Sequence, residues 1–72
     1  MPNRSVLVRA TPIELAQLLK FAGLAPTGGA AKHAIVQGEV TVNGDVERRK
    51  GRKLEAGDRV AYRGETVVVA ID

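Results

Sequence analysis

The sequence lacks cysteine and tryptophan, and its 72 residues include only one histidine, one phenylalanine and one tyrosine. Without cysteine the chain has no disulfide framework and no thiolate metal site. A single histidine excludes a metal cage or a mechanism built on several histidines within one chain. No apolar run approaches the roughly 18 residues that a membrane span requires. We therefore expect a cytoplasmic protein that uses no metal, no cofactor and no membrane.

The length of the chain limits what it can hold. A domain of this size buries only about 60% of the surface that its unfolded chain exposes, so we expect no enclosed substrate pocket beside an independent core. The carboxylates are scattered over predicted strands and turns, and no set of nucleophile, base and orienting group is visible. His33 is expected on the exposed side of a helix. The sequence thus predicts a single domain, residues 1–72, that is not an enzyme.

Positive charge is concentrated in one short stretch. Residues 48–53, here named the basic segment, read Arg-Arg-Lys-Gly-Arg-Lys and carry five positive charges and no negative one. The rest of the chain has six basic and eight acidic residues, so this segment supplies the whole net charge of +3. A local basic patch on a near-neutral body indicates a surface that binds a polyanion. The alternative is a solvated loop that aids solubility, and in either case we expect a loop that buries little.

The first predicted helix follows Ser5–Val8, a short run rich in strand formers. Thr11 is the expected amino-terminal cap, Pro12 the first helical residue, and Glu14 the partner that completes a capping box. Gly23 is expected to end the helix in the left-handed conformation. The apolar residues that recur at the helical period are Leu15, Leu18, Leu19 and Ala22.

A second helix is predicted between Thr27, its expected cap, and Gly38, and its inner face is made of small residues. Asn43–Gly44 is then a strong hairpin signal that joins the strand Val40–Val42 to a return strand. Another hairpin is predicted around Arg63–Gly64. The sequence therefore predicts an α+β fold in the order β-α-α-β-β-β-β, with two packed helices on a small antiparallel sheet.

The stretch from residue 23 to residue 58 resembles the S4 RNA-binding domain. That pattern has a helix-ending glycine, a serine or threonine four residues later, small and aliphatic residues on the next helix, a V-x-V-N-G hairpin and a closing G-D turn. The landmarks in this chain are Gly23, Thr27, Ala31, Ile35, Gly38, Val40–Gly44 and Gly57–Asp58. With the preceding helix the resemblance covers residues 11–62, and it implies an S4-like fold of the αL type.

Within this superfamily the chain is most similar to the small stand-alone YbcJ-like proteins of bacteria. One position departs from the general S4 pattern, because Gly28 stands where many members have arginine directly after the Ser/Thr. A side-chain phosphate contact common in the family is therefore absent here. The features shared with the YbcJ-like proteins are Leu18-Leu19-Lys20, Gly28, Ala31-Lys32 and Glu47-x-Arg49-Lys50-x-x-Lys53.

The start of the second helix is a candidate phosphate site. The first amides of a helix have no partner inside the helix, and the helix dipole places partial positive charge there. Gly28 and Gly29 let an anion approach these amides closely, and Lys32 lies one turn further along. The alternative is that the two glycines only allow a sharp corner between the helices.

The S4 resemblance implies that RNA lies across the two helices and the loop beside them, with the basic residues on one face. The implied partner is structured RNA, with ribosomal RNA or the ribosome among the candidates, and we expect a monomer. The expected RNA-binding residues are Lys20, Thr27, Gly28, Gly29, Lys32, Arg48, Arg49, Lys50, Arg52 and Lys53.

The scarcity of aromatic residues bears on the kind of RNA. Phe21 is expected to be a half-buried helix residue and Tyr62 a cross-strand packing residue, rather than stacking platforms. Proteins that read single strands stack bases on several exposed aromatic side chains. We therefore expect recognition of folded RNA through its phosphates and its shape.

Other classes of function compete with RNA binding. A protein-interaction domain could pair through an exposed strand edge or the run Val67–Val69, with the basic segment serving solubility. RNA binding requires instead that the basic residues converge on one face with residues 27–29. A small sulfur carrier needs a Gly-Gly tail, whereas this chain ends Val-Ala-Ile-Asp, so that class is not expected. A role in RNA modification would need a catalytic domain on another chain.

Overall fold

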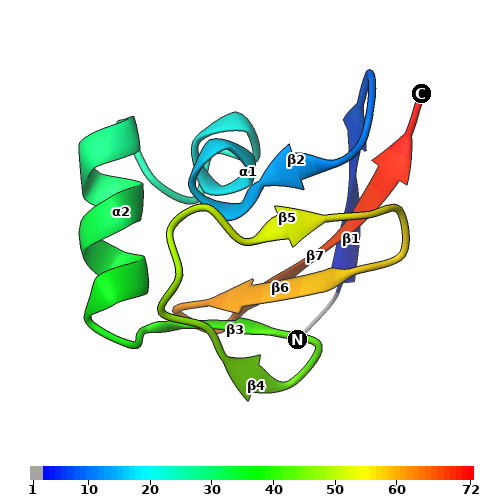
Figure 1. The fold of residues 1–72 in the computed structure, drawn as a ribbon. Helices are drawn as coiled ribbons and strands as arrows, with labels where there is room; N and C mark the ends of the chain where they lie inside the picture. Colours follow the sequence, from blue (N-terminus) through cyan, green and yellow to red (C-terminus); the bar gives the residue numbers. More distant parts are fainter. Residues whose placement is uncertain (1–2) are drawn as a thin grey trace.

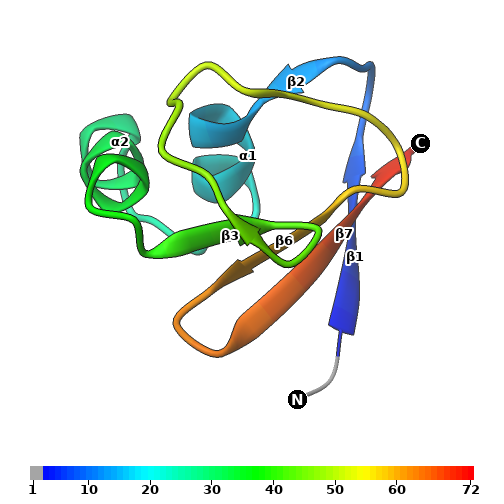
Figure 2. The same cartoon turned by 60° about the horizontal axis from the view of Figure 1, so that its bottom comes forward.

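The computed structural model describes residues 3–72, in which two helices cover one face of a five-stranded sheet (Figure 1, Figure 2). This arrangement confirms the expected α+β class. Neither helix within residues 3–72 is long and apolar enough to cross a membrane. The helices are α1 (Leu15–Phe21) and α2 (Gly28–Val36). The strands are β1 (Asn3–Val8), β2 (Ile13–Glu14), β3 (Val40–Val42), β4 (Asp45–Val46), β5 (Lys53–Leu54), β6 (Arg59–Tyr62) and β7 (Glu65–Ile71).

The main sheet is mixed, whereas an antiparallel sheet was expected. Its strand order is β1-β7-β6-β3-β4, and β1 runs parallel to β7 while the other neighbours are antiparallel. A further small sheet, which the sequence pattern does not predict, pairs β2 with β5. Alternation of apolar residues reports which face of a strand is buried but not which strand is its neighbour or in which direction it runs. This is why both features were missed.

The hydrophobic core lies between the sheet and the two helices (Figure 2). Leu15, Leu18 and Leu19 are fully buried, as the helical stripe predicted, and each such side chain contributes about 2 kcal/mol of burial free energy. The inner face of α2, formed by Ala31, Ala34 and Ile35, packs against α1. The other buried residues of this core are Val6, Val8, Ala16, Ala22, Ala25, Ala31, Ala34, Ile35, Val40, Val42, Leu54, Val60, Val67 and Val69.

Both helices end at the glycines that the sequence predicted. Gly23 has a φ of 77° and Gly38 a φ of 79°, a left-handed conformation that only glycine adopts without cost. After α1, the amide of Leu24 donates to the carbonyl of Leu19 (2.9 Å) and the amide of Gly23 to that of Lys20 (3.1 Å). Leu24 then packs against the core. These bonds satisfy carbonyls that the helix end would otherwise leave unpaired.

The expected start of the first helix is wrong. Thr11 and Pro12 precede the helix, and Glu14 occupies the cap position without a side-chain bond to the helix. Residues Ile13–Glu14 instead form β2 and pair with β5. The amide of Leu15 donates to the carbonyl of Arg52 at 2.8 Å. A main-chain carbonyl of the basic segment thus accepts the hydrogen bond of the first helical amide, a role that a local side chain usually has.

Candidate nucleic-acid interface

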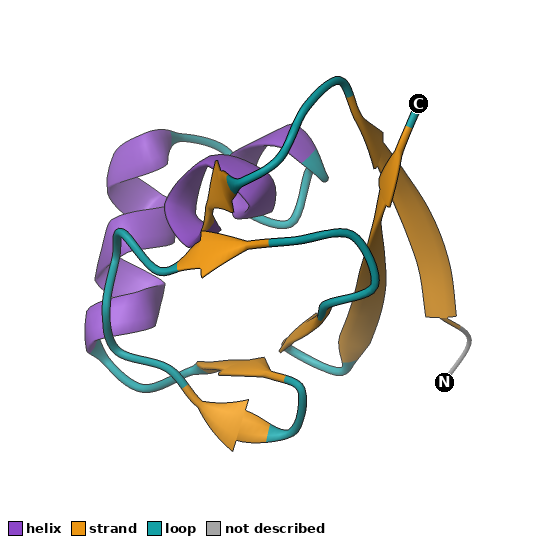
Figure 3. Cartoon of the chain, turned by 45° about the vertical axis from the view of Figure 1, so that its right-hand side comes forward, coloured by secondary structure: helices purple, strands orange, loops and turns teal. Residues whose placement is uncertain are grey.

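The basic segment runs beside both helices (Figure 1, Figure 3). It leaves β4 near the carboxyl end of α2, where a Cβ built on Gly38 would lie 2.6 Å from Nη2 of Arg48. The guanidinium of Arg48 therefore lies over this glycine, close to the negative end of the α2 dipole. Further along, the carbonyl of Lys50 accepts from the amide of Ala16 at 3.4 Å, one residue after the bond between Leu15 and Arg52. The segment is thus attached to α1 by main-chain hydrogen bonds at one end, and its Arg48 side chain lies beside the end of α2 at the other.

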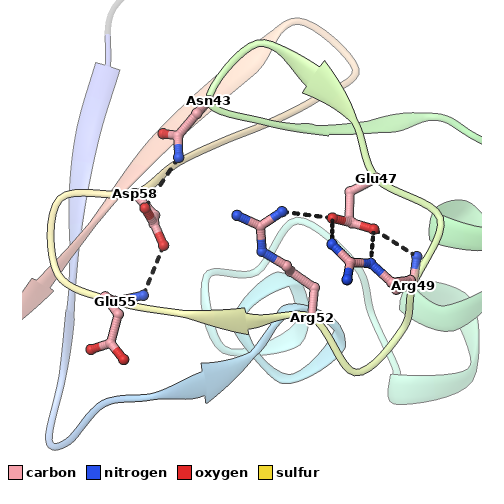
Figure 4. A network of polar contacts seen from close by, with 6 residues as sticks. All are labelled: Asn43, Glu47, Arg49, Arg52, Glu55 and Asp58. Carbon is pink, nitrogen blue, oxygen red and sulfur yellow. Dashed lines mark hydrogen bonds and ion pairs between the residues drawn. The ribbon is translucent and has the colours of Figure 1, made fainter.

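One buried carboxylate organises the side chains of this segment (Figure 4). Glu47 is only 7% exposed. Its Oε2 accepts from Nε of Arg49 at 2.8 Å and from the Arg49 amide at 3.1 Å, and its Oε1 accepts from Nη2 of Arg49 at 2.9 Å. Nη1 of Arg52 donates to the same Oε1 at 2.7 Å. The fork of Arg49 thus holds the carboxylate in a bidentate pair, the strongest geometry for such a contact.

This cluster corrects the expectation that the basic segment buries little. The side chain of Arg52 is only 32% exposed, and Leu54 just after the segment is fully buried. Lys53 pairs with Glu14 at 3.0 Å on the surface. The sequence showed Glu47 only as part of a family pattern, because nothing in a single chain says that a glutamate beside five cations turns inward.

Hydrogen bonds from Arg49 and then from Arg52 lower the pKa of Glu47 from its ordinary 4.5 to about 2, although burial alone would raise it. The carboxylate in turn raises the pKa of Arg49. Glu47 therefore stays charged at any physiological pH, and the cluster holds its shape without a titration switch.

Three cations of the basic segment are thus partly neutralised, and two are not. Arg49 and Arg52 share Glu47, and Lys53 faces Glu14. Among residues 3–72, no carboxylate lies within ion-pair distance of Arg48 or Lys50. The unpaired charges of the segment are therefore those of Arg48 and Lys50, both of which are exposed.

The start of α2 has the cap that the sequence predicted. Oγ1 of Thr27 accepts from the amide of Ala30 at 3.0 Å. The amides of Gly28 and Gly29 make no hydrogen bond to any residue that the structure describes. A Cβ on Gly28 would meet no atom within 4 Å, and one on Gly29 would meet only Oγ1 of Thr27, at 3.9 Å. Packing therefore does not require these glycines, and there is room where a side chain at either position would begin.

The interface extends along α2. Its nine residues place the free amides about 13 Å from the end where Arg48 lies, at 1.5 Å per residue. Lys32 is exposed between these two ends, and Lys20 is exposed in the last turn of α1. His33 is exposed, as expected, and within residues 3–72 no group of three acidic or histidine side chains could hold a metal.

The two aromatic residues have different surroundings. Tyr62 is half-buried against the core, with the guanidinium carbon of Arg63 5.3 Å from its ring centroid, which confirms its packing role. Phe21 is 62% exposed, so the expectation of a half-buried residue is wrong. It lies at the end of α1 and lines an open groove with Ile13, Gln17 and Lys20.

The S4 landmarks on the far hairpin have a structural role. The side chain of Asn43 donates to Asp58 at 3.1 Å (Figure 4). It also accepts from the amide of Arg59 at 2.9 Å. Asp58 also accepts from the amide of Glu55 at 2.8 Å. These bonds join the V-N-G hairpin to the G-D turn. The side chains of Asn43 and Asp58 are therefore engaged in bonds between turns, and we assign them no part in the candidate interface.

Glu47→Gln should destabilise the protein at pH 7 by about 1–3 kcal/mol, because the variant loses charge-assisted hydrogen bonds. The pKa of Glu47 is lowered on folding, so its stabilising effect is full above about pH 4.5 and is lost as the pH falls toward 2. Urea unfolding of both proteins between pH 7 and pH 2.5 should show the difference shrinking with acid. Glu39→Gln, at an exposed site, is the control. A difference that stays constant over this range would contradict the assignment.

Comparison with known proteins gives concordant results. The S4 domain family model matches residues 6–70. YbcJ of Escherichia coli (strain K12) is 46% identical over 57 residues, which cover 79% of this chain and 81% of YbcJ. RlbA of Bacillus subtilis (strain 168), named a probable ribosome maturation protein, is 44% identical over 72% of this chain and 73% of its own length. A tyrosine–tRNA ligase of Ralstonia nicotianae is 48% identical over 75% of this chain but only 14% of the ligase.

A solved structure agrees with the sequence matches. The solution structure of E. coli YbcJ covers 97% of this chain and 87% of its own, with 41% identity and a TM-score of 0.68. The match therefore extends from the sequence landmarks to the arrangement of helices and sheet. On the family model, the relatives and this structure together, the chain belongs to the S4 domain family.

Proposed function

We propose that this chain is a non-enzymatic protein that binds folded RNA through its phosphates and shape. The observation that carries the proposal is the basic segment, which main-chain bonds attach to the start of α1 and which Glu47 holds in shape, with Arg48 and Lys50 unpaired among the described residues. The relatives support it, since the YbcJ solution structure is described as revealing an αL motif involved in RNA binding. A fixed array of cations and amides binds phosphates that are held at a fixed spacing more tightly than it binds the phosphates of a flexible strand.

The ten candidate residues divide into two kinds of role. We assign direct phosphate contacts to Lys20, Lys32, Arg48 and Lys50, which are exposed, and to the amides of Gly28 and Gly29. The remaining candidates shape the surface and add charge at its edge. These are Thr27 as the helix cap, Arg49 and Arg52 around Glu47, and Lys53 beside Glu14.

Ribosomal RNA is the folded RNA that we favour as the target. RlbA is named for ribosome maturation and shares 44% of the aligned residues. We propose further that residues 1–72 act as one domain, as a monomer in the cytoplasm.

A protein-interaction domain is the second candidate. β1 lies at one edge of the sheet, so its outer backbone groups have no strand beside them within residues 3–72. Such pairing would not require the basic segment. This segment runs beside α2, and β1 lies on the opposite side of the molecule from α2 (Figure 1, Figure 2). RNA binding is favoured because it accounts for the fixed basic surface.

Lys50→Gln should weaken RNA binding and flatten the dependence of log affinity on log salt by about 0.7–0.9, the value of one lost phosphate contact. The Lys50 side chain makes no ion pair in the described structure, so the fold should be unchanged. Arg9→Gln removes the same charge at an exposed residue directly after β1, a strand that lies on the opposite side of the molecule from α2 (Figure 1). Filter binding over a salt series should separate the two variants, and equal slopes would show that position does not matter.

Gly29→Leu should reduce RNA affinity more than stability, because the side chain would cover the free amides of α2. Gly29→Ala is the matched control, and it should raise stability by up to about 1 kcal/mol because alanine restricts the unfolded chain. Thermal unfolding and fluorescence anisotropy with labelled RNA measure both effects. If Gly29→Leu mainly lowers the melting temperature while the folded fraction binds normally, the glycines serve the corner between the helices.

The protein should bind an RNA hairpin more tightly than an unstructured strand of equal length and charge at the same salt. Equal charge matters because counterion release alone favours any polyanion. An anisotropy competition between the two RNAs measures this preference. Equal affinity would reduce the function to general polyanion binding, and preference for the unstructured strand would contradict recognition by shape.

A further inference from the structure

An open apolar groove lies on α1, next to the proposed phosphate surface. It is lined by Ile13, Gln17, Lys20 and Phe21 and has a volume of about 390 Å³, at the lower end of the range for small-ligand sites. Ile13 belongs to β2, which pairs with the end of the basic segment at Lys53–Leu54. The groove is therefore continuous with the surface to which we assign RNA.

The exposure of Phe21 has no explanation in the folding of α1. The helix buries Leu15, Leu18 and Leu19 completely on its other face. Phe21 follows them in the same helix but leaves 62% of its surface in water, although it is the sole phenylalanine of the chain. A large aromatic side chain contributes to stability mainly by burial, so this ring is of little use to the fold where it stands.

The chemistry of the groove fits a nucleobase. An exposed aromatic face stacks on any base, because every base has a π-face. The side chain of Gln17 offers both a donor and an acceptor for the polar edge of a base. Lys20 is the charged residue among the four that line the groove, and its positive sign complements the phosphate that accompanies every base. A carboxylate lining would instead repel RNA, and the groove has none among these residues.

We propose that this groove holds one unpaired nucleobase, stacked on Phe21, while the neighbouring phosphates lie on the basic surface. This rests on the proposed RNA-binding function and specifies its target as a folded RNA with an unpaired nucleotide beside a helix. One stacked base is compatible with the general scarcity of aromatic residues, since the site needs only one ring.

The test compares two hairpins of equal charge. One carries a single-stranded overhang of three adenosines, and the other carries three abasic nucleotides in the same place, with 5′ and 3′ versions of each. The wild-type protein should bind the adenosine hairpin more tightly, and Phe21→Ala should lower that affinity about tenfold, within the 1–3 kcal/mol of base–aromatic stacking. Binding of the abasic hairpin should not change. Leu7→Ala, at another exposed apolar side chain on β1, is the matched control and should change neither affinity.

A second variant gives a direct signal. The chain has no tryptophan, so Phe21→Trp introduces a single reporter at the groove. Its emission should be quenched by the adenosine hairpin and not by the abasic one. The proposal is overturned if the wild type binds both hairpins equally, or if Phe21→Ala weakens both to the same extent. Binding of the abasic hairpin by the wild type tests the proposed function separately, because it depends on phosphates alone.

Discussion

The main-chain bonds between the basic segment and the start of α1 are the constraint on which the interface depends. The first amides of α1 donate to the carbonyls of Lys50 and Arg52, and β2 pairs with β5 immediately beside them. A helix start normally finds its partners in a local side chain. Here it finds them in the segment that carries the charge, so forming the helix also fixes the cations. A solubility loop has no need of such an attachment.

Glu47 reduces the electrostatic repulsion that results from holding five cations within six residues. Like charges held close together repel, and a rigid segment cannot separate them. A nearly buried carboxylate between Arg49 and Arg52 offsets this repulsion and leaves the outer cations for a ligand. Two of the cations in the segment thus pair with Glu47 and maintain the shape of the segment. The number of positive charges counted along the sequence therefore overstates the number that would be unpaired and available to an RNA.

The sequence predicted features that depend on neighbouring residues and missed those that depend on distant ones. The glycines that end both helices and the Thr27 cap could be predicted from the sequence, because a few adjacent residues determine each of them. The signals at Thr11, Pro12 and Glu14 were equally local, yet pairing of β2 with β5 prevailed over them. The role of Glu47 could not be predicted, because nothing local shows that a glutamate beside five cations turns inward. The exposure of Phe21 could not be predicted either, because helical period alone does not say where a side chain at the margin of the buried face points.

The parallel pairing of β1 with β7 joins the two ends of the fold, since residue 3 lies opposite residue 66 and residue 8 opposite residue 71. Contacts between such distant parts of a chain close a large loop and slow folding relative to local contacts. During synthesis, β1 is made before its partner β7. β1 thus has no partner strand until β7 has been made, and the sheet is completed only after the chain between the two strands has been synthesised.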